Sequence, residues 1–303
     1  MITGGRGFIG YHLKEELKKN NQVIVLDNLF HPCQAPVDDT FHYADVRYYH
    51  EIESWVKWAD IVYHLAAQIH VDRSIEFPQE TIDVNVTGTL NILEACRKYH
   101  KKMIFASSSE VYGTSQVDKI NERHPLDGQS PYAASKISGD RLCKAYYDTY
   151  GLDVTILRNF NAFGPYQNDT SYGGVIARFT KAALSGEPLY VYGGGEQQRD
   201  YIYITDALFG YRICAQHNLS GQAINIGTGY TITINELARF IKNITKSNSE
   251  IIHTEPRPGE VQRLCADISL AQQYGFKPTT NFKQHLEHYI KWYANQSLPK
   301  HIR

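Results

Sequence analysis

Three glycines near the start of the chain constrain its fold more than any other feature. Gly4, Gly7 and Gly10 precede an amphipathic helical pattern from Tyr11 to Lys19. Glycine at these spacings permits a tight turn, lets backbone N–H groups approach a pyrophosphate and allows a helix to pack close to a strand. The pattern therefore predicts the first strand–helix unit of a dinucleotide-binding sheet.

The residues on either side of this helix extend the prediction. An apolar run over 22–26 predicts the next strand, and Asp27 follows it directly. An acid at this place accepts hydrogen bonds from the adenosine ribose, which favours NAD over NADP. Only Met1 and Ile2 precede the glycine turn, so the first strand is expected to be very short for a central strand, which typically has about five residues.

Composition excludes several functional classes. The formal net charge is −1 over 303 residues, which argues against a nucleic-acid or membrane surface. No apolar run approaches the ~18 residues of a membrane span, and no signal peptide fits. The five cysteines form no C-x-x-C pair and the thirteen histidines form no H-x-x-x-H cluster. These patterns predict reduced thiols in a cytoplasmic protein without a structural metal.

Apolar runs alternate with helical patterns through the first half of the chain, as in an α/β doubly wound parallel sheet. The expected strands cover 22–26, 41–44, 60–65, 102–107, 153–158 and 222–226. The expected helices cover 8–19, 48–57, 81–99, 131–150, 205–217 and 233–246.

The amino-acid composition changes after residue 164, where glycine, tyrosine and proline become frequent. We therefore expect a nucleotide-binding domain over 1–164, to which 205–235 returns. Segments 165–204 and 236–303 are expected to form a smaller C-terminal α/β substrate-binding lobe. The ligand cleft should lie between the two, at the carboxyl ends of the strands.

A catalytic pattern falls on the helix expected at 131–150. Tyr132 and Lys136 are four residues apart, so both project from one face. A nearby ammonium favours the phenolate and lowers a tyrosine pKa from about 10, which would make Tyr132 a general base. The strand at 102–107 ends in serines, and the Ser108 hydroxyl can bond a reacting oxygen there.

Together these motifs resemble the extended short-chain dehydrogenase/reductase family, and its nucleotide-sugar epimerases and dehydratases most of all. The matching motifs are Gly4-x-x-Gly7-x-x-Gly10, Asp27-Asn28-Leu29, His64-Leu65-Ala66-Ala67-Gln68, Asn85-Val86-x-Gly88-Thr89, Ser108 and Tyr132-x-x-x-Lys136. The resemblance covers nearly the whole chain. It implies a Rossmann-type fold, bound NAD and a UDP-glucose 4-epimerase-like chemistry.

The resemblance also implies roles for individual residues. Ser108, Tyr132 and Lys136 would be the catalytic trio. The cofactor-binding residues would be Gly4, Gly7, Phe8, Ile9, Gly10, Asp27, Asn28, Asp45, Val46, Leu65, Ala66, Ala67, Asn85, Tyr132 and Lys136. The substrate-binding residues would be Ser108, Ser109, Asn161, Val175 (in a nucleotide-contacting stretch over 172–176), Tyr192, Arg199 and Arg257. The two arginines suit a nucleotide-diphosphate sugar, because each guanidinium donates parallel hydrogen bonds.

The branch of the family stays open at this point. Ser109-Glu110 and the run His70-Val71-Asp72-Arg73-Ser74 are similar to 4,6-dehydratases, and Ser109-Glu110 is also similar to uronic acid decarboxylases. Segments 172–176 and 257–269 are similar to the epimerases. We favour a 4-epimerase, with Glu110 a catalytic residue in the dehydratase or decarboxylase alternative. A non-catalytic NAD-binding sensor of the same fold is a third alternative. By resemblance, helices 81–99 and 131–150 would form a homodimer interface.

Overall fold

The computed structural model describes residues 1–31, 33–170, 173–279 and 281–297. Its centre is a seven-stranded sheet in the order β11-β6-β5-β4-β1-β2-β3, with every neighbouring pair parallel. The strands are β1 (Ile2–Thr3), β2 (Val25–Asp27), β3 (Phe41–Tyr43), β4 (Ile61–His64), β5 (Lys102–Ser108), β6 (Val154–Asn159) and β11 (Ala223–Ile226). All six strands expected from the sequence are therefore present, and the predicted fold class is confirmed.

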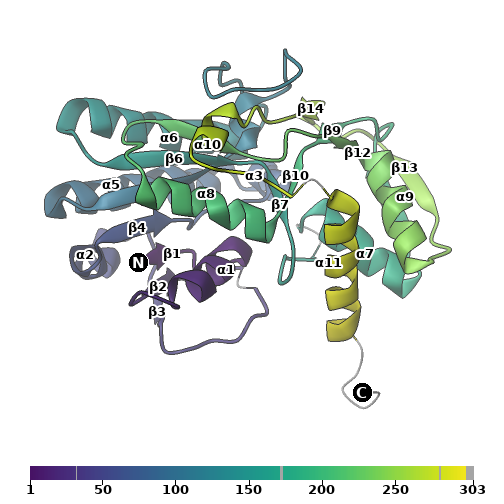
Figure 1. Cartoon of the computed structure of the whole chain (residues 1–303), viewed down its shortest axis with the longest axis horizontal. Coiled ribbons are helices and arrows are strands. Elements are labelled where there is room, and N and C mark those ends of the chain that lie inside the picture. The colour runs from purple at the N-terminus through teal and green to yellow at the C-terminus, as the bar shows by residue number, and fades with distance from the viewer. Residues whose placement is uncertain (32, 171–172, 280, 298–303) are drawn as a thin grey trace.

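Helices cover both faces of this sheet (Figure 1). Alternate residues of one strand enter different cores: Ile104 of β5 packs in one hydrophobic cluster, and Met103 and Phe105 pack in another. This division follows from the two-residue period of a strand. The flanking helices are α1 (Phe8–Leu17), α2 (Tyr49–Trp58), α5 (Gly88–Tyr99), α6 (Pro131–Tyr150) and α8 (Ile204–Gln216). Helix α1 packs with α8, whereas α5 packs with α2 and α6.

The first strand is as short as expected, yet it lies inside the sheet. Ile2 pairs with Val25 of β2 on one side and with Tyr63 of β4 on the other. Its side chain is fully buried. The brief strand thus brings the glycine turn directly to the carboxyl edge of the sheet.

The helix expected over 81–99 is the main departure from the sequence prediction. Helix α4 (Pro78–Ile82) begins earlier, and a π-helical turn, η1 (Asp83–Thr87), separates it from α5. The turn places Asn85 where its side chain bonds the backbone of Gln68, at 2.8 and 2.9 Å. Helical periodicity could not predict this turn, because a distant loop supplies the partner.

The rest of the chain forms smaller layers beside the large sheet (Figure 1). Three small sheets pair β7 with β10, β9 with β12 and β14, and β8 with β13. Their strands are β7 (Asn161–Phe163), β8 (Leu189–Tyr192), β9 (Gln198–Arg199), β10 (Tyr201–Tyr203), β12 (Ile232–Thr233), β13 (Ile251–Thr254) and β14 (Arg263–Leu264). The remaining helical elements are α3 (Val71–Glu76), η2 (Ser109–Tyr112), α7 (Val175–Ser185), α9 (Ile234–Thr245), α10 (Ser269–Gln273) and α11 (Phe282–Ser297).

A buried carboxylate ties these layers together. Asp200 lies between β9 and β10 and is 0% exposed. Its oxygens accept hydrogen bonds from the Thr228 N–H (2.8 Å) and hydroxyl (2.6 Å), the Gly229 N–H (2.9 Å) and the Ala266 N–H (3.1 Å). Thr228 and Gly229 follow β11 of the large sheet, and Ala266 follows β14. One side chain therefore joins three segments that are distant in sequence.

A buried histidine makes the stability of the fold sensitive to acid. His64 lies between the hydroxyls of Thr3 (2.7 Å) and Thr89 (3.0 Å). Burial, with a smaller contribution from the Lys136 charge, lowers the pKa of His64 to about 3. In the unfolded chain that pKa is about 6.5. Below pH 6.5, His64 binds a proton in the unfolded state but not in the folded state. The free energy of unfolding therefore falls as the pH drops from about 6.5 toward 3.

We therefore expect His64→Gln to lose less stability on acidification than the parent protein does. Between about pH 7 and pH 5.5 the difference should be about 1 kcal/mol, since one pKa unit corresponds to about 1.4 kcal/mol. Urea unfolding at the two pH values measures it. Equal losses in both proteins would contradict the role of His64.

Candidate active site

A cavity of about 530 Å³ lies at the carboxyl edge of the large sheet and extends to the smaller layers. Most of the residues selected from the sequence line it. They are Gly4, Gly7, Phe8, Ile9, Gly10, Asp27, Asn28, Val46, Leu65, Ala66, Ala67, Ser108, Glu110, Tyr132, Lys136, Asn161, Val175, Tyr192, Arg199 and Arg257. Asp45, Asn85 and Ser109 do not line it. Of the 172–176 stretch, Tyr172 lies outside the described residues.

The glycine turn is shaped for close approach by a ligand backbone. Gly4 has φ +67°, and a Cβ there would lie 2.6 Å from the Ala66 nitrogen. A Cβ on Gly10 would lie 2.4 Å from the Gly4 oxygen. Neither position has room for a side chain. Glycine at both positions therefore lets the turn pack against helix α1 and leaves its backbone accessible from the cavity. This geometry fits the pyrophosphate of NAD.

Asp27 stands at the end of β2, at the far side of this turn. Its carboxylate accepts hydrogen bonds from the N–H groups of Arg6 (2.9 Å) and Leu29 (2.8 Å). Burial raises the pKa of Asp27, and these two N–H groups oppose the rise. The bonds fix the carboxylate at the cavity wall, where it can accept from ribose hydroxyls.

Asp45 and Asn85 support the cavity from behind its wall. Asp45 accepts hydrogen bonds from Asn28 (2.9 Å) and from the guanidinium of Arg47 (2.6 Å), both of which line the cavity. Asn85 holds the backbone of Gln68, another lining residue, and also donates to the Ser135 hydroxyl at 2.8 Å. Sequence reasoning missed Arg47, although its place two residues after Asp45 was a usable signal.

The residues at the serine-rich end of β5 point in different directions. Ser108 caps the 3₁₀ turn η2, because its hydroxyl accepts from the Glu110 N–H at 3.2 Å. The turn directs Ser109 into the core, where it is 2% exposed. Glu110 lines the cavity instead, and burial raises the pKa of its carboxyl while the nearby Arg199 charge lowers it.

Helix α6 presents Tyr132 and Lys136 to the cavity. Ser130 caps the helix at its expected start, with its hydroxyl accepting from the Ala133 N–H at 3.1 Å. Both Tyr132 and Lys136 are buried. The Lys136 ammonium donates to the Ala106 carbonyl at 2.9 Å, and burial lowers the pKa of Lys136 to about 8.

The sequence predicted that the ammonium of Lys136 lowers the pKa of Tyr132. For the protein without a bound ligand this prediction is wrong. Burial raises the pKa of Tyr132 to about 12, and a hydrogen bond with Ser108 opposes the rise. The ammonium of Lys136 makes its hydrogen bond to Ala106, and removal of the phenol from water outweighs any help from its charge. Spacing along a helix predicted the shared face and could not predict the desolvation.

The two arginines meet at a single carboxylate. Glu260 accepts a hydrogen bond from Arg199 at 2.7 Å and forms an ion pair with Arg257, whose Nε lies 3.1 Å from its other oxygen. Arg257 also lies 3.5 Å from Asp72 and stacks over the Tyr192 ring, 5.0 Å from its centroid. The cavity therefore contains two convergent guanidinium groups that are held in place before any ligand enters.

Among the described residues, no group of three or more histidine, cysteine or acidic side chains could hold a metal ion. None of the helices within the described ranges is long and apolar enough to cross a membrane. The five cysteines are buried free thiols.

Comparison with known proteins agrees with this geometry. Residues 1–227 match the family described as NAD dependent epimerase/dehydratase. A putative UDP-glucose 4-epimerase of Methanocaldococcus jannaschii is 36% identical, over 98% of this chain and 99% of that protein. A UDP-N-acetyl-alpha-D-glucosaminuronate decarboxylase of Bacillus cytotoxicus is also 36% identical, over 97% of each chain.

A solved structure shares the whole fold. The UDP-glucose 4-epimerase of Thermotoga maritima, determined with UDP-glucose, superposes with a TM-score of 0.93 at 31% identity, over 97% of this chain and 98% of that one. Relatives with epimerase and decarboxylase names are thus equally similar in sequence, and they share the NAD-dependent chemistry of one enzyme family. The chain belongs to the NAD-dependent epimerase/dehydratase family of nucleotide-sugar enzymes.

Proposed function

We propose that this chain is a nucleotide-sugar 4-epimerase that acts on a UDP-hexose or UDP-hexuronate through a transient 4-keto sugar. One observation carries the proposal. Ser108, Tyr132 and Lys136 line the same cavity as the glycine turn and the two arginines. That cavity can hold a cofactor at one end and an anionic nucleotide sugar at the other.

A single acid–base group is sufficient for this reaction. Tyr132, as phenolate, takes the proton from the sugar O4 while the C4 hydrogen leaves as hydride, so C4 becomes a carbonyl. Ser108 bonds the same oxygen and stabilises its changing charge. The keto sugar then turns over in the cavity, and Tyr132 returns the proton to O4 as hydride reaches the opposite face of C4.

The residues at the glycine turn would hold the cofactor. Gly4, Gly7 and Gly10 provide the pyrophosphate cradle, Asp27 the ribose contact and Lys136 a second ribose contact. NAD⁺ held by these residues would supply the acceptor and later the donor of the hydride, and its positive charge would favour the ionised form of Tyr132. Tyr132 needs this assistance, because burial raises its pKa to about 12.

The substrate would lie at the other end of the cavity, in the proposed lobe formed by 165–204 and 236–303. Arg199 and Arg257 would bind the diphosphate through their paired donors. Asn161, Val175 and Tyr192 also line the cavity, which supports their proposed contact with the nucleotide sugar. We further propose a cytoplasmic homodimer; the free thiols and the packing of α5 on α6 support it.

The position of Ser109 favours epimerisation over 4,6-dehydration. A dehydratase needs an acid and a base besides the tyrosine, to remove water across C5 and C6. Of Ser109 and Glu110, only Glu110 lines the cavity. Glu110 remains the observation in favour of the second candidate, a dehydratase or uronate decarboxylase that uses this one carboxyl group.

We expect Glu110→Gln to leave an epimerase with at least about a tenth of its turnover, because no proton in the 4-keto cycle passes through this residue. A dehydratase that used Glu110 as base would lose about 100-fold or more. Initial rates with the parent's own substrate measure the difference, and Glu187→Gln, at an exposed position outside the cavity, is the matched control. A loss of that size with product of changed mass would overturn the epimerase assignment.

A substrate panel tests the proposed function directly. The protein is incubated with UDP-glucose, UDP-N-acetylglucosamine, UDP-glucuronate and dTDP-glucose, and the products are analysed by mass spectrometry and proton NMR. A product of unchanged mass with inverted C4 supports the proposal. Loss of water or of CO2 replaces it with the second candidate. No turnover with any member would mean either a rarer sugar substrate or the non-catalytic sensor.

A further inference from the structure

Helix α6 carries a buried acid one turn beyond Lys136. Asp140 follows Lys136 by four residues, so both side chains lie on one face of the helix. Asp140 is 2% exposed and Lys136 is 4% exposed. Lys136 lines the cavity and Asp140 does not, so the acid lies behind the cavity wall. Burying a carboxylate is unfavourable unless it is paired, and its partners therefore indicate what it does.

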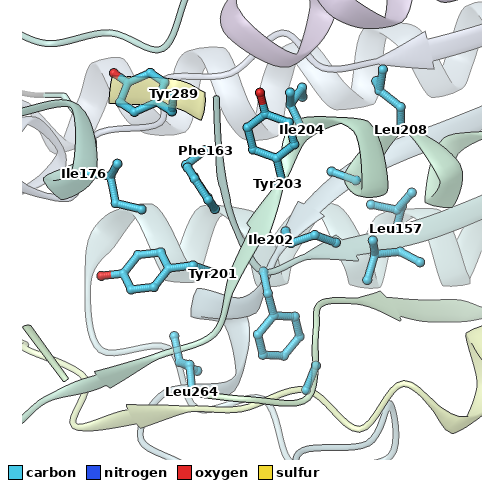
Figure 2. Close-up of a cluster of buried hydrophobic side chains, with 14 of the residues drawn as sticks. Leu157, Phe163, Ile176, Tyr201, Ile202, Tyr203, Ile204, Leu208, Leu264 and Tyr289 are labelled. Atoms are coloured by element: carbon cyan, nitrogen blue, oxygen red, sulfur yellow. The ribbon is translucent and has the colours of Figure 1, made fainter. Parts of the chain in front are cut away.

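Arg158 of β6 is the first partner of Asp140. The preceding residue, Leu157, belongs to the apolar cluster shown in Figure 2, together with Ile202 and Leu208. Successive residues of a strand point to opposite faces, so Arg158 points toward α6 instead. Its Nε donates a hydrogen bond to Oδ2 of Asp140 at 2.7 Å. Burial raises the pKa of Asp140 and the Arg158 charge opposes the rise, so the ion pair favours the ionised carboxylate.

Groups outside helix α6 hold the Arg158 guanidinium in place. Its Nη1 donates to the Tyr112 hydroxyl and to the Glu122 carbonyl, both at 2.9 Å. The Tyr112 hydroxyl donates in turn to the side-chain oxygen of Asn225 in β11, at 2.6 Å. Tyr112 is the last residue of η2. Two strands and η2 therefore fix the charge that faces Asp140.

The Lys136 ammonium has few charged neighbours. The titratable groups that interact with it are Asp140 and Cys143 on its own helix and His64 on β4. Burial raises the pKa of the Cys143 thiol and lowers that of His64 to about 3, so both are neutral at neutral pH. Glu110 of η2 interacts with the charges of the two arginines instead. Of the three groups around Lys136, only Asp140 is negatively charged.

We propose that Asp140 is a positioning residue whose buried carboxylate keeps the Lys136 ammonium charged behind the site of reaction. Burial lowers the pKa of Lys136 to about 8, and the charge of Asp140 opposes this lowering. Without that carboxylate, more of Lys136 is neutral at physiological pH, and a neutral amine does not favour the Tyr132 phenolate. The effect on catalysis rests on the proposed function, whereas the charge of Lys136 does not.

An NMR titration of protein with ¹³C-labelled lysine tests the inference without any substrate, and Lys136→Arg identifies the Lys136 resonance. We expect Asp140→Asn to lower the pKa of Lys136 from about 8 to about 7 or below, because loss of a nearby opposite charge changes a pKa by about 1 or more. The matched control is Asp148→Asn. Asp148 also follows a lysine of α6 by four residues and pairs with it, but both side chains are exposed. This control should leave the Lys136 titration unchanged.

A second variant covers the loss of the ion pair. Asp140→Asn leaves a buried guanidinium without its carboxylate, so it is also combined with Arg158→Met, which removes that charge. The double variant should show a lowered pKa of Lys136 as well. An unchanged Lys136 titration in either folded variant refutes the inference, because a purely structural residue changes stability and not this titration.

The pH dependence of epimerisation tests the part that rests on the proposed function. Turnover needs Lys136 charged, so in Asp140→Asn the fall of turnover at alkaline pH should begin at a pH about 1 lower than in the parent. A lowered pKa of Lys136 with an unchanged pH profile would refute the positioning role. If the parent turns over no nucleotide sugar, the proposed function fails, and the NMR titration still decides whether Asp140 controls the charge of Lys136.

Discussion

Tyr132→Phe should reduce turnover about 100- to 10,000-fold while the protein still retains NAD. The substitution removes one oxygen, and general acid–base catalysis contributes a factor of that size. NAD retention should survive, because the glycine turn and Asp27 are remote from the lost hydroxyl. Initial rates with the substrate found by the panel, and release of nucleotide after denaturation, measure the two properties.

Tyr146→Phe is the control for this experiment. Tyr146 is on the same helix, but its hydroxyl bonds Glu94 and it does not line the cavity. It should keep near-parental turnover. If Tyr132→Phe did so as well, Tyr132 could not be the base, and the buried phenol would have only a structural part in the cavity.

Asp200→Ala should lower the free energy of unfolding by about 4 kcal/mol. The change leaves the donors of Thr228, Gly229 and Ala266 without their acceptor, and each unpaired buried donor costs about 1–3 kcal/mol. A compensating gain reduces the total, because burial raises the pKa of the Asp200 carboxyl and so disfavours its charge. Equilibrium urea unfolding at constant pH measures the loss.

The comparison for this variant is Asp118→Ala. The Asp118 carboxylate also pairs with a partner, Arg263 at 2.9 Å, but its side chain is 94% exposed. A surface pair of this kind contributes about 0–1 kcal/mol. Similar losses in the two variants would mean that the Asp200 bonds do not hold the layers together.

Local signals predicted the frame of the molecule. The glycine spacing, the alternation of apolar runs and the Ser130-Pro131 helix start each depend on a few neighbouring residues, and the structure has all three where the sequence indicated. The strand ends at Asp27 and Ser108 lie at one edge of the sheet because parallel strands share their direction.

Features that depend on distant contacts were not predictable in this way. The π turn around Asn85 depends on the hydrogen bonds that Asn85 makes with the backbone of Gln68. The direction of the Ser109 side chain depends on the N-cap that Ser108 forms. The pKa of Tyr132 likewise depends on how completely the fold removes its ring from water.

The bridge made by Glu260 has a consequence for which anions this cavity can admit. Arg199 and Arg257 already share a carboxylate, so an entering anion gains only the excess of its attraction over that of Glu260. A ligand with one negative charge would replace one ion pair with another and gain little. A ligand with two or more charges can engage both guanidinium groups while Glu260 stays near them. For the proposed diphosphate substrate, the internal carboxylate would therefore set a threshold on ligand charge that anions with a single charge do not meet.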